Sequence, residues 1–132
     1  MTEEYVPPKE IKRCPIDTTF KIVGKKFTVH IIRDIAMRDK TRFNEFLDSV
    51  EGINSNTLAT RLHEMEKNGL IRRKIFHETP IRIKYILTDK GKDLIPILEQ
   101  MAAFSMKHAP EIFVDGKTRT FQKACGRNPA SL

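Results

Sequence analysis

Residues 55–92, SNTLATRLHEMEKNGLIRRKIFHETPIRIKYILTDKGK, contain a helical pattern followed by two strand-like patterns. In the first part apolar residues recur at i, i+4 and i+7: Leu58, Leu62 and Met65. This spacing predicts one buried face of an α-helix that opens near Ser55, and Asn68-Gly69 is typical of its C-terminal stop. The runs IRRKIFH and IRIKYIL follow, with Glu78-Thr79-Pro80 between them, and the second run alternates apolar and basic residues. The stretch therefore predicts a helix followed by a β-hairpin.

Three shorter helices are predicted before this stretch. The first runs from Asp17, a good N-cap, to a stop at Gly24. The second covers residues 27–39, FTVHIIRDIAMRD, whose apolar residues form a stripe at the helical period. Thr41 is predicted to cap the third. The apolar faces of these helices predict a common core.

A last long helix is predicted over residues 89–107, with Thr88 as its N-cap. Pro96 is expected to kink it, because proline removes a backbone hydrogen bond. Its apolar side chains cover most of its circumference: Leu94, Ile95, Ile97, Leu98, Met101, Ala102, Phe104 and Met106. Such a helix must be buried on two sides, so we expect the rest of the domain on one side and a second subunit on the other. The residues predicted at the dimer interface are Leu94, Leu98, Met101 and Phe104.

The predicted order of elements is α-α-α-α-β-β-α, a mainly α fold with a small β-hairpin. A short helix that leads through a tight turn into another, followed by a basic hairpin, is typical of a winged helix-turn-helix. We expect dimerisation through the terminal helices. The 132 residues suffice for one such domain. We divide them into a flexible arm (1–13), a winged helix-turn-helix domain (14–112) that includes the dimerisation helix (about 89–107), and a C-terminal tail (113–132).

The charge of the chain is positive and unevenly distributed. Its net charge is +7 and its pI about 9.6, values that suit a polyanionic partner. Residues 70–92 hold seven basic and two acidic residues, a net charge of +5. Residues 93–116 hold one basic and four acidic residues, a net charge of −3. Positive charge concentrated in this way favours a phosphate-binding surface.

Several classes of protein do not fit the sequence. No segment reaches the roughly 18 apolar residues of a membrane-spanning helix, and the N-terminus lacks the apolar region of a secretory signal, so we expect a cytoplasmic protein without membrane contact. The two cysteines, Cys14 and Cys125, are far apart, and the four histidines are scattered. The sequence has no HExxH motif, no Gly-rich phosphate loop and no GxSxG elbow. We therefore expect no metal, no cofactor and no enzymatic activity.

Five motifs occur together in this chain: CPID from residue 14, IVGKKFTVHIIRDI from residue 22, RFNEF from residue 42, GINSNTLATRLHEMEKNGL from residue 52 and TPIRIKYILTDKG from residue 79. In this combination the chain resembles the HxlR family of bacterial and archaeal transcriptional regulators, from Cys14 to about Met106. Lys25 and Phe27 stand where the family usually has Gly and Trp. The resemblance implies a homodimeric DNA-binding repressor or activator that acts on a nearby pseudo-palindromic operator. Some relatives sense electrophiles or oxidants through the cysteine of the CP motif, which corresponds to Cys14.

The fourth helix is the predicted recognition helix. Its outward residues can enter a DNA major groove, where Asn pairs with adenine, Arg with guanine, and Thr contacts the thymine methyl group. The residues predicted to bind DNA here are Ser55, Asn56, Thr57, Thr60 and Arg61, with Glu64 also facing outward. The other interpretation is that this face is only the solvated side of an amphipathic helix. The basic hairpin that follows favours DNA binding.

The hairpin is the predicted wing. Its basic residues are Arg72, Arg73, Lys74, Arg82 and Lys84, and they cannot all face DNA, because a strand exposes alternate residues on one side. We assign phosphate or minor-groove contacts to Arg72, Lys74, Arg82 and Lys84, with Arg82 nearest the wing tip. Lys26, at the start of the second helix, is assigned a further backbone contact. The alternative is that these charges are only solvated, but their density of one sign favours phosphate.

The sequence allows two interpretations of Cys14 and two of the function of the whole chain. Cys14 is either a thiol that senses a small electrophile or oxidant, which requires neighbouring cations to approach its sulfur, or a small residue packed beside Pro15. The chain as a whole is predicted to be a sequence-specific double-stranded DNA-binding regulator, and the alternative is a winged-helix module that binds protein or RNA. The many cations argue against a protein-binding wing. The absence of Trp, with Phe mostly at core positions, argues against base stacking on RNA.

Overall fold

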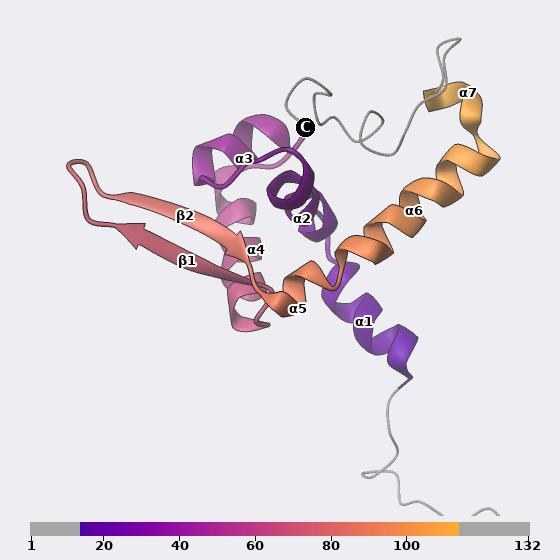
Figure 1. Cartoon of the computed structure of the whole chain (residues 1–132), viewed down its shortest axis with the longest axis horizontal. Helices are drawn as coiled ribbons and strands as arrows, with labels where there is room; N and C mark the ends of the chain where they lie inside the picture. The colour runs from indigo at the N-terminus through magenta and orange to yellow at the C-terminus, as the bar shows by residue number, and fades with distance from the viewer. Residues whose placement is uncertain (1–13, 114–132) are drawn as a thin grey trace, which may run out of the picture.

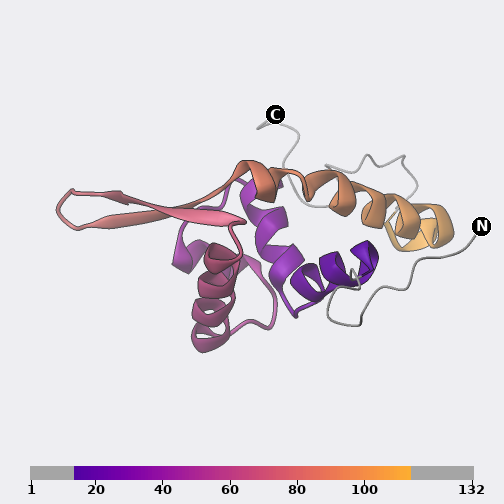
Figure 2. The same ribbon diagram turned by 90° about the horizontal axis from the view of Figure 1, so that it is seen from below.

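The computed structural model describes residues 14–113, so the predicted arm (1–13) and all but the first residue of the predicted tail lie outside the described residues. A helical body carries a two-stranded hairpin on one side, while α1 and α6 extend on the opposite side (Figures 1 and 2). In chain order the elements are α1 (Pro15–Val23), α2 (Thr28–Met37), α3 (Phe43–Ser49), α4 (Ser55–Lys67), β1 (Ile71–Phe76), β2 (Arg82–Leu87), α5 (Asp89–Lys92), α6 (Ile95–His108) and α7 (Pro110–Phe113). The predicted winged helix-turn-helix is confirmed. Among the described residues, no helix combines the length and the apolar character that a membrane span requires.

Helix α4 begins and ends where local chemistry predicts. The side chain of Asn54 accepts a hydrogen bond of 2.8 Å from the backbone N–H of Thr57, so Asn54 caps the helix that opens at Ser55. The helix ends at Lys67 with Asn68 as its C-cap, and Gly69 follows with φ of 74°. Glycine takes this left-handed conformation without the steric cost that other residues incur, which explains the stop.

Two of the predicted helix starts are wrong. Helix α1 begins at Pro15 rather than after Asp17, because the fixed φ of proline suits the first helical position, where an N–H has no helical partner. Helix α3 has Arg42, not Thr41, at its N-cap. The Oε1 atom of Glu45 accepts hydrogen bonds from the N–H groups of Thr41 (3.1 Å) and Arg42 (3.0 Å). These bonds, chiefly the one from Thr41, hold the pKa of Glu45 below its ordinary value.

The core lies where α2, α3 and α4 meet the base of the hairpin. Side chains of that core with at most 2% exposure are Ile31, Ile32, Phe46, Val50, Leu58, Leu62, Met65, Leu70 and Ile71. The hairpin is joined to it by the ring of Tyr85, whose centroid lies 6.2 Å from that of Phe46. The N–H of Tyr85 also donates a 2.7 Å hydrogen bond to the carbonyl of Thr41, just before α3. The base of the wing is thus fixed to the helical body.

The single long helix predicted over residues 89–107 is wrong, because the chain forms α5 and α6 with a break at Asp93 and Leu94. Thr88 does act as an N-cap, but of the short α5, where its side chain accepts from the N–H of Gly91. A continuous helix would need the N–H of residue 96 to bond the carbonyl of Lys92. Pro96 has no N–H, so it lies instead in the first turn of α6.

Gly91 lies where α5 touches the start of β1. A Cβ atom at this position would collide with the backbone carbonyl of Leu70 and would also come within 3.1 Å of the Leu87 side chain. The N–H of Thr88 donates to the same Leu70 carbonyl at 3.0 Å. The approach of the two backbones therefore requires a residue without a side chain.

We expect Gly91→Ala to lower the free energy of unfolding by about 1–3 kcal/mol, the usual effect of overpacking. In an exposed helix the same change raises stability by about 0.5–1 kcal/mol. The sign of the effect therefore distinguishes a crowded position from an exposed one. Urea unfolding of the full chain measures it. Lys92→Ala, in the exposed next position, is the control and should change stability by less than about 0.5 kcal/mol. A gain in stability from Gly91→Ala would contradict the described contact with Leu70.

Candidate nucleic-acid interface

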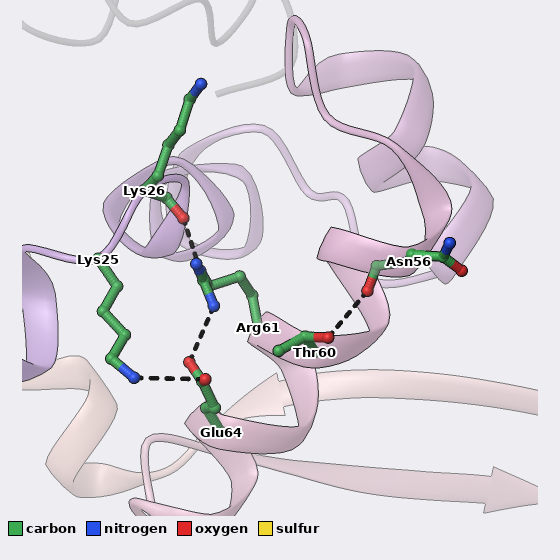
Figure 3. A network of polar contacts seen from close by, with 6 residues as sticks. All are labelled: Lys25, Lys26, Asn56, Thr60, Arg61 and Glu64. Atoms are coloured by element: carbon green, nitrogen blue, oxygen red, sulfur yellow. Dashed lines mark hydrogen bonds and ion pairs between the residues drawn. The ribbon is translucent and has the colours of Figure 1, made fainter.

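The outward face of α4 is polar at its N-terminal end. Ser55, Asn56 and Thr60 are exposed, whereas Thr57 is half-buried and its backbone N–H is held by the cap. The hydroxyl of Thr60 donates a 3.0 Å hydrogen bond to the backbone carbonyl of Asn56, and the side-chain amide of Asn56 projects away from the helix (Figure 3). An exposed amide in this position can reach a base edge.

Two further residues belong to this face and were not among the predicted site residues. Ala59 and His63 are both exposed on α4. They line a cavity of about 220 Å³ between α4 and the hairpin, together with Arg73 and Tyr85. His63 lies seven residues after Asn56, so the helical period alone was a sufficient signal to find it.

Arg61 and Glu64 do not face outward freely, which corrects their predicted orientation. The Arg61 side chain is only 19% exposed, and its Nε donates a 2.8 Å hydrogen bond to the backbone carbonyl of Lys26. Its Nη1 atom lies 3.1 Å from Oε2 of Glu64, and Oε1 of Glu64 lies 3.3 Å from Nζ of Lys25 (Figure 3). The four groups connect α4 to the turn between α1 and α2.

The register of the hairpin separates its cations into two faces. Directly opposite residues in an antiparallel pair share a face, and the pairs Arg72–Ile86, Lys74–Lys84 and Phe76–Arg82 alternate with the others along the ladder. All four cations assigned to DNA therefore lie on one face: Arg72, Lys74, Arg82 and Lys84. Arg73 lies on the other face, where its Nε is 3.1 Å from Oε1 of Glu66 on α4. The alternation that the sequence implied thus separates Arg73, which pairs with α4, from the other four cations.

Two lysines face each other at the centre of the cationic face. Lys74 and Lys84 are direct partners in the ladder, and their Nζ atoms lie 5.5 and 5.2 Å from the centroid of the Phe76 ring. Like charges in this position repel, and the electron-rich ring face offsets only part of that repulsion. An anion bound over both ammonium groups would relieve the remaining repulsion. Nearer the tip, Nε of Arg82 lies 3.6 Å from Oε2 of Glu78, on an exposed part of the hairpin.

Lys26 lies on the turn before α2, beside α4. Its side chain is exposed, with Nζ 5.0 Å from the centroid of the Phe27 ring, and points away from the Arg61–Glu64 contacts (Figure 3). Phe27 itself is buried and has φ of 77°, a conformation that few residues other than glycine adopt. The backbone of this turn is therefore held by its surroundings, and the Lys26 ammonium projects from it into solvent.

A second surface, apolar rather than cationic, lies between α1 and α6. A groove of about 510 Å³ is lined by Ile16, Phe20, Val23, Val29, Ile97 and Met101, among others. Phe104, one turn further along α6, is 68% exposed. Leu94 and Leu98 were predicted at a dimer interface but are only 8% and 7% exposed, since they pack into the protomer's own core. The structure thus corrects their assignment and leaves Met101 and Phe104 available.

Cys14 is the N-cap residue of α1 and is exposed at the start of this helix. Its carbonyl accepts hydrogen bonds from the backbone N–H and the hydroxyl of Thr18, at 2.9 and 3.0 Å. Pro15 and Ile16, the next two residues, line the apolar groove. Cys125 lies outside the described residues. Within residues 14–113, no cluster of three or more His, Cys, Asp or Glu side chains could hold a metal ion.

Known proteins are similar to this chain in sequence and in fold. The HxlR-like helix-turn-helix family model matches residues 22–113. An uncharacterised HTH-type transcriptional regulator of Halalkalibacterium halodurans, BH0655, is 34% identical over 108 residues, which are 82% of this chain and 96% of the relative.

Two solved structures of regulators are similar along most of their length. The reduced form of the transcriptional regulator YodB from Bacillus subtilis superposes with a TM-score of 0.62 at 29% identity, covering 76% of this chain and 98% of YodB. The redox regulator HypR in its oxidised form gives a TM-score of 0.64 at 31% identity, covering 72% of this chain and 97% of HypR. The extent of the family match, together with the exposed face of α4 beside a cationic wing, shows that this chain belongs to the HxlR-like helix-turn-helix family.

Proposed function

We propose that this chain is a sequence-specific double-stranded DNA-binding transcriptional regulator that acts as a homodimer on a pseudo-palindromic operator. The observations that carry the proposal are the exposed polar start of α4 and the four cations that share one face of the hairpin that follows it. The regulators similar to this chain, BH0655, YodB and HypR, are consistent with it. Since BH0655 and YodB are transcriptional regulators, we propose regulation rather than catalysis.

The helix and the wing have different tasks in this proposal. Side chains at the start of α4, Asn56 and Thr60 above all, enter the major groove and contact base edges. The hairpin cations lie over the sugar-phosphate backbone, where Lys74 and Lys84 gain most from a phosphate between them. Phosphate contacts set affinity and register but are blind to sequence, whereas base contacts set preference.

Asn56→Ala and Lys74→Ala are expected to weaken DNA binding in different ways. Asn56→Ala should lower affinity by about 1–3 kcal/mol for a duplex that the wild type selects from a random pool, and should relax preference at one base pair. Lys74→Ala should weaken selected and random duplexes alike, and should reduce the slope of log affinity against log salt by about one. Binding to both duplexes across a salt series measures the two effects.

Arg73→Ala is the matched control for the wing. Arg73 is adjacent to Lys74 but lies on the opposite face, paired with Glu66, so its removal should leave the salt slope unchanged. An unchanged slope in Lys74→Ala, or a changed base preference there, would contradict the assignment of the wing to phosphate.

The second subunit in this proposal covers the apolar surface of α1 and α6. Phe20 and Met101, which line the groove between these helices, are 64% and 50% exposed, and Phe104, one turn further along α6, is 68% exposed. Exposed apolar side chains gathered on one side of a small protein indicate a contact surface. A symmetric dimer buries the same patch on both copies, which directs two recognition helices at the two halves of a pseudo-palindrome.

Met101→Glu is expected to convert a dimer into monomers, because it places a charge in the proposed interface at a side chain that the protomer's own core does not need. Sedimentation at micromolar concentration measures the molecular mass. Ile81→Glu, at a 65% exposed apolar residue near the wing tip, is the control and should leave the mass unchanged. A monomeric wild type would contradict the proposed interface.

Cys14 is the proposed point at which a small electrophile or oxidant acts on DNA binding. Its exposure at the start of α1, beside the proposed dimer surface, supports this, as does the similarity to the redox regulator HypR. A modified thiol there would disturb the packing of α1 against the second copy.

We expect diamide treatment to change the operator affinity of the wild type and to leave that of Cys14→Ser unchanged. Fluorescence anisotropy of a labelled duplex before and after treatment measures both. Cys125→Ser is the control and should respond as the wild type does. Equal responses of the wild type and Cys14→Ser would remove Cys14 from the proposal.

A further inference from the structure

Arg61 makes a polar contact between α4 and a distant part of the chain. Its Nε donates a 2.8 Å hydrogen bond to the carbonyl of Lys26, a residue 35 positions away in the sequence. Lys26 directly precedes Phe27, whose left-handed backbone begins α2. The guanidinium therefore bonds the backbone of the turn that carries the Lys26 ammonium (Figure 3).

Glu64 fixes the guanidinium in this position. One carboxylate oxygen lies 3.1 Å from Arg61, and the other lies 3.3 Å from Nζ of Lys25. The side chains of Arg61 and Glu64 are 19% and 29% exposed, so water screens their contact less than that of a surface pair. A planar guanidinium with one donor on a carbonyl and another on a carboxylate has little freedom to rotate.

This arrangement leaves Arg61 poorly placed to contact a base. A guanidinium that contacts guanine uses two of its donors, and in Arg61 the Nε–H group donates to the Lys26 carbonyl while the Nη1 atom donates to Glu64. Asn56, five residues nearer the start of α4, and Thr60, directly before Arg61, are exposed and can act as base contacts. The role that residue type alone suggests for Arg61 is therefore not the one its surroundings support.

We propose that Arg61 and Glu64 are positioning residues that hold the base-contacting start of α4 in register with the phosphate-contacting Lys26. The inference rests on the proposed function, because it assumes that α4 and Lys26 contact one duplex. Base edges and phosphates in B-DNA have fixed relative positions, so a protein that contacts both needs its two elements held at a fixed separation. Non-specific binding has no such requirement, because either element can find a phosphate by itself.

Because Glu64 is negatively charged, the two interpretations of its role predict opposite changes in DNA affinity when it is removed. A carboxylate near DNA repels phosphate, so if Glu64 had no positioning role its removal would raise affinity for every duplex. If Glu64 holds Arg61, its removal lowers affinity for the selected duplex even though the repulsion is gone. The proposal therefore predicts a change opposite in sign to that expected from electrostatics alone.

The experiment compares the full-length wild type with Arg61→Ala, Glu64→Gln and the double variant. For each protein, affinity is measured for a duplex that the wild type selects from a random pool, for all single-base-pair variants of that duplex, and for a random duplex. All measurements are made well below the melting temperature of the protein. Arg61→Ala should lower affinity for the selected duplex roughly tenfold, and by a similar factor for each single-base-pair variant. Glu64→Gln should weaken the selected duplex while leaving the random duplex unchanged or bound more tightly. The double variant should lose less than the two single losses combined, because both side chains act in one network.

Two results would overturn the proposal. Loss of preference at one base pair only, in Arg61→Ala, would make Arg61 a base contact. Equal changes on selected and random duplexes in Glu64→Gln, in either direction, would make Glu64 a general charge without a positioning role. If the wild type selects no duplex at all, the proposed function itself fails and the inference fails with it, whereas selective binding with either result above rejects the positioning role alone.

Discussion

The rotation of α4 about its own axis is set by the burial of one apolar stripe. Leu58, Leu62 and Met65 are at most 2% exposed, and each buried side chain of this size contributes about 1.5–3 kcal/mol relative to exposure. A rotation by one residue would bring polar side chains into the core and expose the stripe. Because that is so unfavourable, Asn56 and Thr60 must face solvent. The surface that α4 offers to a partner is thus a consequence of the core beneath it.

Helix α2 links the two surfaces on which the proposed function depends. It packs against α6, which carries the apolar face, and against β2, which carries part of the cationic face. Its central residues Ile31 and Ile32 are fully buried. In the proposed dimer, a change in how the two copies pair through α6 would act on a helix that also supports the wing. This connection would give a modification near α1 a physical route to the proposed DNA-binding face.

Much of this organisation follows from local sequence pattern. The period of Leu58, Leu62 and Met65 predicted the buried face of α4, and Gly69 marked its end, because both depend only on residues within a few turns. The alternation of β2 likewise implied that the five hairpin cations could not all share one face. Helix starts were less predictable. Pro15 and Arg42 stand where side-chain chemistry favoured Asp17 and Thr41, since proline geometry and a carboxylate three residues on also define a helix start.

The sequence by itself determined the kinds of element, their order and the faces they bury, because periodicity is a property of neighbouring residues. Tertiary structure decided the partners. It directed Arg61 to the carbonyl of Lys26, buried Leu98 in the protomer's own core, and left Met101 exposed on the same helix. Each of these outcomes depends on a segment far away in the chain, such as the turn before α2 or the packing of α2 on α6. A local sequence pattern carries no information about contacts with such distant segments. A guanidinium that appears free in the sequence is therefore bound in the fold.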